Sequence, residues 1–198
     1  RFLDKKSKIV TSLFNLKAET GGWFHSESVT QIPRPEVTAW ILDAFYNWGE
    51  KQQVDVALED LIKMLDRKED KMFDESILCN SLTLKVICQF SFYEHPLKDK
   101  ILKHIVELSN LIFNSAIRSE EKYLFWPSKT INNNLKFKPP SIVHTAYAIS
   151  ALIKAYHSTN FCTDYDLDSL KPAIDWLKSQ KITREIEREE ITRNTTNK

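Results

Sequence analysis

Glycine is scarce in this chain of 198 residues, with three in all, at Gly21, Gly22 and Gly49. Phosphate-binding loops need glycines at fixed spacings, because only a residue without a side chain lets the backbone approach a phosphate closely. Neither the GxGxxG nor the GxxxxGK[ST] pattern occurs. The sequence therefore argues against a nucleotide-binding loop of either type.

A surplus of one charge and a long apolar run are also missing. The chain has 28 Lys and Arg residues against 27 Asp and Glu residues, a formal net charge of +1. Nucleic-acid partners usually require a clear basic excess, and a spanning helix requires about 20 consecutive apolar residues. The apolar stretches here are shorter than that and are broken by charged, amide or other polar residues. We therefore expect no nucleic-acid partner and no membrane span.

The start of the chain, "RFLDKKSKIV", contains no apolar run followed by a small-residue cleavage site. It also lacks an initiator Met, which is typical of a processed piece or a fragment of a longer chain. The three cysteines, Cys79, Cys88 and Cys162, are odd in number and form no CxxC pair. Reduced thiols in a cytoplasmic protein are the simplest interpretation.

Helical periodicity is the strongest pattern present. In "EVTAWILDAFYNW", residues 36–48, Trp40, Ala44 and Trp48 form one apolar stripe at the helix period, with further apolar residues beside it. Prolines precede several such segments, as expected for a first helical turn, and no convincing strand pattern appears. The sequence predicts an all-α fold of about seven helices, at residues 2–17, 36–48, 53–66, 76–93, 97–113, 140–156 and 168–180.

The order of segments indicates an internal repeat of helical hairpins. Each of three units contains an aromatic residue in a turn, then a helix with small residues, then an amphipathic helix. The units begin at "GGWFHSES", "DKMFDES" and "KYLFWPS". Stacked helix pairs of this kind share a core that one pair cannot form alone.

The strings "TGGWF" followed by "PEVTAWILDAF", and "HTAYAISALIKAY" followed by "LKPAIDWLKSQ", resemble the repeats of the α/α-toroid superfamily. This superfamily includes terpene cyclases and the β subunits of protein prenyltransferases. The resemblance implies inner helices around a central cavity, covered by outer helices. It covers roughly residues 10–180, and the chain has room for only a partial ring of helical-hairpin repeats.

The resemblance also implies candidate site residues. "HTAYAISAL", from His144, is similar to the string that supplies a zinc-binding histidine in prenyltransferase β subunits. Cys79 occupies the corresponding position one repeat earlier, and a thiolate and an imidazole are suitable zinc ligands. Ile77 stands where that family has a third ligand, an Asp. The acidic DxDD motif of cyclases is not matched by "DYDLD" at residues 164–168, which fits a polar loop ending in a helix cap.

Other chemistry remains open for the same residues. Cys79 or Cys88 could act as a nucleophile with His144 as base, but buried cysteines more often behave as small apolar groups. Trp23, Trp40 and Tyr147 are candidates to line an apolar cavity, and His25 is a candidate at its mouth, while aromatic residues at helical spacing are more often core. We expect no cofactor, with zinc as the one metal to test.

The sequence favours a non-catalytic binding or scaffold domain over residues 1–180, within a larger protein or complex. Its expected partner is another protein or another domain of a longer chain. The alternative is a prenyltransferase- or terpene-cyclase-like enzyme with an apolar cavity and an apolar small-molecule substrate. Residues 181–198 are dense in mixed charge and are expected to form a C-terminal extension or linker.

Overall fold

A computed structural model describes residues 2–24, 32–67, 76–119, 122–127, 140–160 and 163–180. These residues contain seven α-helices, one two-stranded sheet and two 3₁₀ turns. The elements are α1 (Phe2–Asn15), α2 (Pro35–Trp48), α3 (Lys51–Asp66), α4 (Ile77–Ile87), η2 (Cys88–Phe90), α5 (Lys98–Asn114), β1 (Ile117–Arg118), β2 (Leu124–Phe125), α6 (Ile142–Ser158), η3 (Asp168–Leu170) and α7 (Lys171–Ser179).

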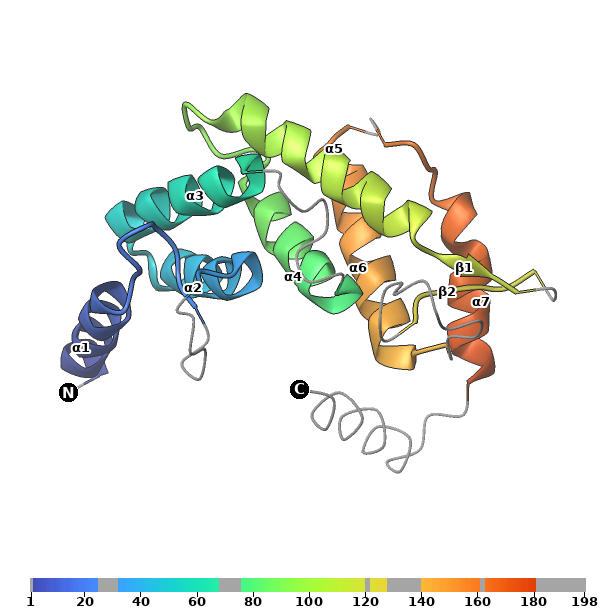
Figure 1. The fold of residues 1–198 in the computed structure, drawn as a ribbon, viewed down its shortest axis with the longest axis horizontal. Helices are drawn as coiled ribbons and strands as arrows, with labels where there is room; N and C mark the ends of the chain where they lie inside the picture. The colour runs from blue at the N-terminus through green and yellow to red at the C-terminus, as the bar shows by residue number, and fades with distance from the viewer. Residues whose placement is uncertain are drawn as a thin grey trace.

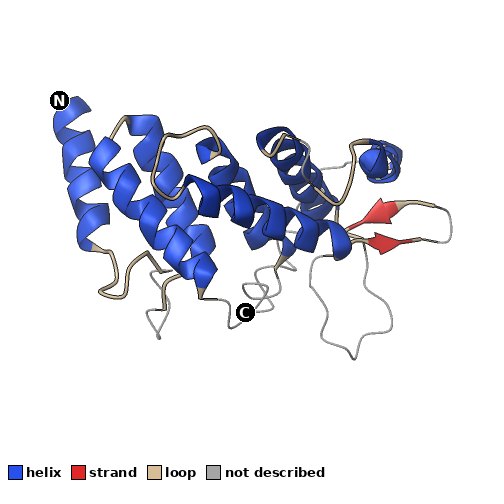
Figure 2. Cartoon of the chain, turned by 90° about the horizontal axis from the view of Figure 1, so that it is seen from above, coloured by secondary structure: helices blue, strands red, loops and turns tan. Residues whose placement is uncertain are grey.

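The helices form two neighbouring rows. One row consists of α2, α4 and α6, in which α4 packs against both of its neighbours. The other consists of α3 and α5, which run along the upper side of the arched molecule in Figure 1. Helix α1 lies at one end of the molecule and the small sheet at the other (Figure 2). None of the helices in the described part of the chain has the length and apolar character needed to cross a bilayer.

The predicted all-α class is confirmed, and the seven helices begin and end close to the expected residues. The differences lie at helix ends and in one connection. Helix α4 ends at Ile87 and continues as a 3₁₀ turn, and a 3₁₀ turn also precedes α7. The antiparallel pair of β1 and β2 was not predicted, because strands of two residues are too short to show alternation. Residues His25, Cys162 and 181–198 lie outside the described residues.

Local sequence signals explain how the row of α2, α4 and α6 is built. Pro35 starts α2, where its missing N–H costs no helical hydrogen bond, and Gly49 ends it with a φ of 72°. Ser76 and Ser141 cap α4 and α6 in the same way: each side chain accepts a hydrogen bond from the backbone N–H three residues later.

The same set of hydrogen bonds occurs at the starts of α2 and α6. Trp23 N–H donates to Thr38 Oγ1 over 3.0 Å, and Trp126 N–H donates to Thr145 Oγ1 over 3.0 Å. The indole N–H of Trp23 donates to the Leu13 carbonyl at 2.6 Å, and that of Trp126 to the Ile112 carbonyl at 2.7 Å. Each tryptophan therefore joins the preceding helix to the helix that follows it.

One charged cluster links α3 to α5. The Asp66 carboxylate pairs with Lys100 at 2.7 Å and with His104 Nε2 at 3.0 Å. His104 is itself buried, and its Nδ1 lies 3.3 Å from the Glu107 carboxylate. The hydrogen bond from Lys100 is the largest of the causes that hold the pKa of Asp66 below its ordinary value. The ionised form of Asp66 therefore stabilises the contact between these helices.

Replacing Asp66 by Asn is expected to lower the free energy of unfolding at neutral pH by about 1 kcal/mol, because the carboxylate is partly screened by solvent. A depressed folded-state pKa stabilises the protein above the unfolded value, and this contribution is lost as pH falls through the folded value. Urea unfolding of both proteins is therefore expected to show a difference that shrinks as pH falls below 3.8.

The control for this prediction is Asp175→Asn, which removes an exposed carboxylate paired with Lys178 within α7. This variant is expected to keep wild-type stability within a few tenths of a kcal/mol. A difference between Asp66→Asn and wild type that stays constant down to strongly acidic pH would contradict the assigned role of Asp66.

Candidate functional site

Two of the predicted site residues occupy equivalent places on neighbouring helices. Cys79 follows the capping residue Ser76 of α4 by three positions, and His144 follows Ser141 of α6 by three positions. Helices α4 and α6 pack against each other. The starts of α2, α4 and α6 therefore carry the polar groups from which a site in this row would be built.

His144 is 2% exposed and belongs to the interior. Its Nδ1 lies 2.7 Å from the Ser141 hydroxyl, and its backbone N–H donates to the same oxygen at 3.3 Å. The serine thus serves both as helix cap and as a partner of the imidazole ring. This contact orients the ring and engages one of the two ring nitrogens.

Cys79 is half-buried, and the buried Glu36 carboxylate of α2 lies beside its thiol. Burial, followed by the negative charge of Glu36, raises the pKa of the Cys79 thiol. Burial also raises the pKa of Cys88 to about 12. Because the thiolate is the nucleophilic form, neither environment activates the cysteine for attack on a substrate.

A zinc ion would bring its own charge and could deprotonate Cys79, so the thiol pKa does not decide the zinc prediction. Catalytic zinc is usually held by three protein ligands. Within the described ranges, no three His, Cys, Asp or Glu side chains come together in a group that could hold a metal ion. The zinc prediction for His144 and Cys79 stays a prediction, and we derive no mechanism through a metal.

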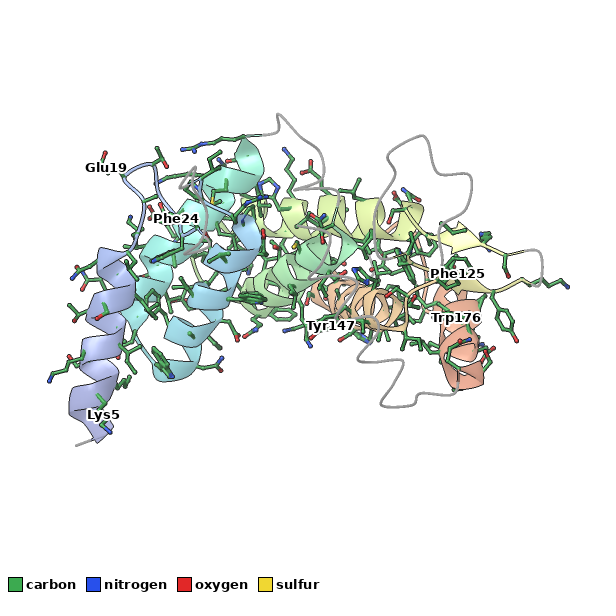
Figure 3. The ribbon with its side chains drawn as sticks, turned by 60° about the horizontal axis from the view of Figure 1, so that its bottom comes forward. Lys5, Glu19, Phe24, Phe125, Tyr147 and Trp176 are labelled. Atoms are coloured by element: carbon green, nitrogen blue, oxygen red, sulfur yellow. The ribbon has the colours of Figure 1, made fainter. Side chains whose placement is uncertain are left out.

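The three predicted aromatic cavity residues lie in different surroundings. Trp23 is buried in the core, edge-on to Phe45. Trp40 of α2 is 50% exposed, and Tyr147 of α6 is 38% exposed. Tyr147 projects from α6 near the middle of the molecule (Figure 3). The fourth candidate, His25, lies outside the described residues, so its prediction stays untested.

Trp40 and Tyr147 hold matching positions on their helices. Each follows by two residues a threonine, Thr38 or Thr145, that accepts the hydrogen bond of a buried tryptophan. Leu82 holds the matching position on α4, counted from the capping residues Ser76 and Ser141. We give the name row face to five residues of α2, α4 and α6: Trp40, Leu82, Lys85, Tyr147 and Lys154.

Polar contacts join the helices along the row face. Lys154 of α6 donates to the Lys85 carbonyl of α4 at 2.8 Å, and Gln89 of η2, directly after α4, donates to Asp43 of α2 at 2.8 Å. Burial is the main cause that lowers the pKa of Lys154, and the nearby charge of Lys85 adds to it. The row face thus combines exposed aromatic rings with two neighbouring lysines.

The sequence did not predict that Glu36 would lie beside Cys79, or that Lys154 would belong to the row face. An acidic residue in a first helical turn is ordinary, because it favours the positive end of the helix dipole. The position of Glu36 beside Cys79 depends on how α2 packs against α4. Packing between two helices cannot be predicted from the local sequence of either one. Lys154 lies seven residues after Tyr147, two helical turns along the same face, and that spacing was the one available signal.

Burial raises the pKa of both described thiols, Cys79 and Cys88, and His144 is buried against its own helix cap. The row face, in contrast, offers exposed rings and cationic groups on three packed helices. In comparisons with protein-family models, curated proteins and solved structures, nothing matches this chain.

Proposed function

We propose that the chain is a non-catalytic binding domain, built from helical hairpins as a partial α/α toroid. In this proposal α2, α4 and α6 are inner helices and α3, α5 and α7 are outer helices. The alternating order of the helices and the two matching tryptophan–threonine contacts support it. The arched outline of the described helices in Figure 1 is compatible with a ring segment.

The observation that carries the binding function is the exposure of Trp40 and Tyr147 at matching helix positions. Large aromatic side chains are usually buried, and exposed rings are enriched at protein interfaces. Trp23 and Trp126, which are buried, show that the same chain does use its tryptophans as core residues. The exposed pair is therefore a candidate set of anchors for a partner.

The charges on the row face indicate which chemical groups a complementary partner would carry. Lys85 is exposed, and Lys154 reaches across to the same part of α4. A protein segment that places apolar side chains next to carboxylates would match both the rings and the lysines. We therefore propose an acidic, apolar protein segment as the occupant of the row face.

Site-specific photocrosslinking tests the binding surface. A benzoyl-phenylalanine photocrosslinker at position 40 or 147 is expected to capture the same protein, identified by mass spectrometry. The control position is Lys103, an exposed residue of α5 on the other row. Lys154→Glu is expected to abolish the crosslink by reversing the charge. No crosslink at either position, or equal capture at position 103, would overturn the proposal.

Purified partner would then allow affinity to be measured. Trp40→Ala and Tyr147→Ala are each expected to weaken binding about 10- to 100-fold, as for aromatic anchors at the centre of an interface. Because both rings are exposed, their loss is expected to change the free energy of unfolding by less than about 1 kcal/mol. A loss of binding that accompanies unfolding would not count as support for the proposal.

One observation favours the alternative, an enzyme of prenyltransferase or terpene-cyclase type. Glu36 lies beside Cys79, so a carboxylate from α2 stands near the thiol although Ile77 replaces the expected Asp. Elemental analysis of the purified wild type, beside His144→Ala, tests it. About one zinc per chain, lost in the variant, would make the enzyme the leading hypothesis. If neither protein contains zinc, the binding domain stays the leading hypothesis.

A further inference from the structure

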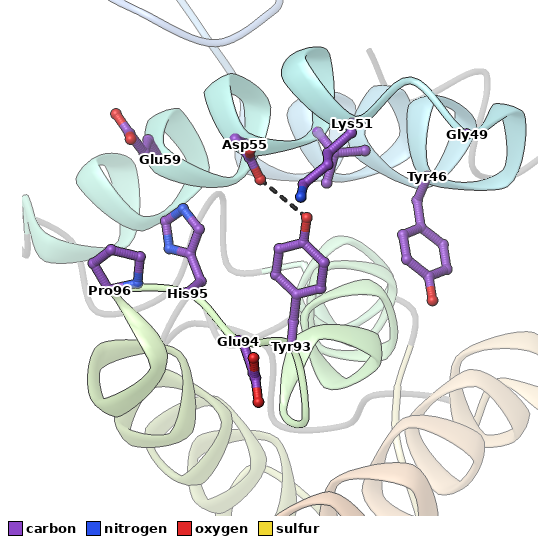
Figure 4. A pocket seen from close by; sticks show the side chains of 10 residues that line it. Tyr46, Gly49, Lys51, Asp55, Glu59, Tyr93, Glu94, His95 and Pro96 are labelled. Atoms are coloured by element: carbon purple, nitrogen blue, oxygen red, sulfur yellow. Dashed lines mark hydrogen bonds between the residues drawn. The ribbon is translucent and has the colours of Figure 1, made fainter.

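A cleft lies between α3 and the segment that connects α4 to α5, and none of its lining residues belongs to the row face. Its volume is about 700 Å³, within the range of small-molecule sites. Figure 4 shows Lys51, Asp55 and Glu59 of α3 on one side and Tyr93, His95 and Pro96 of the connection on the other. Tyr46 of α2 closes one end of the cleft.

The aromatic walls of the cleft are held in place by the core. Tyr46 and Tyr93 both pack edge-on against Phe90, with ring centroids 5.3 and 5.7 Å away. Phe90 itself is fully buried. The His95 ring stacks on Tyr93 at 6.2 Å, and its Nδ1 accepts the Leu97 backbone N–H at 3.2 Å. The rings are therefore preorganised before any ligand arrives.

The charges that line the cleft are mainly negative. Asp55, Glu59 and Glu94 line it together with a single lysine, Lys51. Asp55 accepts a hydrogen bond from the Tyr93 hydroxyl at 3.1 Å, which places that carboxylate at the aromatic wall. Glu59 also pairs with Lys63 at 3.6 Å, on an exposed part of α3. Carboxylates together with aromatic rings form a combination that attracts organic cations.

We propose that this cleft binds an organic cation, an ammonium or guanidinium group carried on an apolar stem. The cation would lie near Asp55 and the rings of Tyr46 and Tyr93, while its stem would pack on Pro96. The cation has two sources, a free amine or a Lys or Arg side chain of another protein. The proposal does not depend on the function of the row face.

The test is an NMR titration of the whole chain with capped lysine and capped arginine, each an N-acetyl methylamide. Capped norleucine is the matched probe, because it keeps the lysine stem without the charge. Saturable shifts are expected at the amides of Gly49, Tyr93 and His95 with the charged probes alone. Equal shifts with capped norleucine, or no saturation up to about 10 mM, would overturn the proposal.

Variants distinguish binding in the cleft from a general effect of the protein's charge on the affinity. Asp55→Asn is expected to weaken binding about 3- to 10-fold, and Tyr46→Leu about 2- to 5-fold. Asp175→Asn removes an exposed carboxylate on α7 and is expected to leave the affinity unchanged. Equal weakening by Asp175→Asn would assign the binding to the overall charge of the protein and overturn the site.

Butylammonium distinguishes the two sources of the cation. If it binds as tightly as capped lysine, the cleft recognises a free amine, because the peptide groups add nothing. If capped lysine binds more tightly, the cleft also contacts the backbone and receives a side chain of a protein. Both results support the cation site.

Discussion

Replacing Trp126 by alanine is expected to lower the free energy of unfolding by about 3–5 kcal/mol, the usual cost of deleting a buried tryptophan. The side chain is completely buried among the ends of α5, α6 and the small sheet. Its removal leaves a cavity and breaks the indole hydrogen bond to the Ile112 carbonyl. Chemical unfolding followed by circular dichroism measures the loss.

Two further variants show which property of Trp126 matters. Trp126→Phe keeps a ring but loses the indole hydrogen bond to the Ile112 carbonyl and part of the buried side chain, and is expected to cost about 1–3 kcal/mol. Trp40→Ala deletes the same side chain from a half-exposed position and is expected to cost less than about 1 kcal/mol. Equal losses in Trp126→Ala and Trp40→Ala would contradict the burial assigned to the two residues.

Replacing Gly22 by alanine is expected to cost about 2–5 kcal/mol, from two separate causes. The backbone at Gly22 has a φ of 77°, which is unfavourable for a residue with a side chain. A Cβ there would lie 2.8 Å from Met64 Sδ and 2.8 Å from Thr38 Oγ1. The second contact matters further, because Thr38 Oγ1 accepts the Trp23 backbone N–H.

Gly49→Ala is the matched control, because it isolates the backbone cost. Gly49 has a φ of 72°, but apart from its own chain neighbours no atom of the described residues lies within 4 Å of the position that its Cβ would take. We expect a loss of about 1–2 kcal/mol for this variant, measured by the same unfolding experiment. A Gly22→Ala loss no greater than that of Gly49→Ala would show that the crowding around Gly22 relaxes at no cost.

The helices could be predicted from the sequence because each keeps the apolar period of a helix over several turns. Which side of each helix is buried in the core was harder to predict. The segment 36–48 is apolar around much of its circumference, so the stripe of Trp40, Ala44 and Trp48 looked as suitable for burial as any other. In the structure, Ala39, Leu42 and Phe45 are fully buried, and Trp40 is half-exposed.

Tertiary packing decided the features that the sequence did not predict. The hairpin of β1 and β2 packs on α7 through Phe125 and Trp176, whose ring centroids lie 5.7 Å apart (Figure 3). Residues far apart in the chain make this contact, so the periodicity of the local sequence does not predict it. Cys79 and His144 hold matching positions because each follows a capping serine by three residues, and capping is a signal that the local sequence does contain.

The arrangement of α2, α4 and α6 in a row has a mechanical consequence. Helix α4 contacts both neighbours, and its two interfaces lie in series along the arch. A rotation of a few degrees at each interface would add up between α2 and α6, while each pair keeps its own buried residues. We therefore expect the separation of Trp40 and Tyr147 to vary more than the separation of the helices within either packed pair, because it adds the small movements at both interfaces.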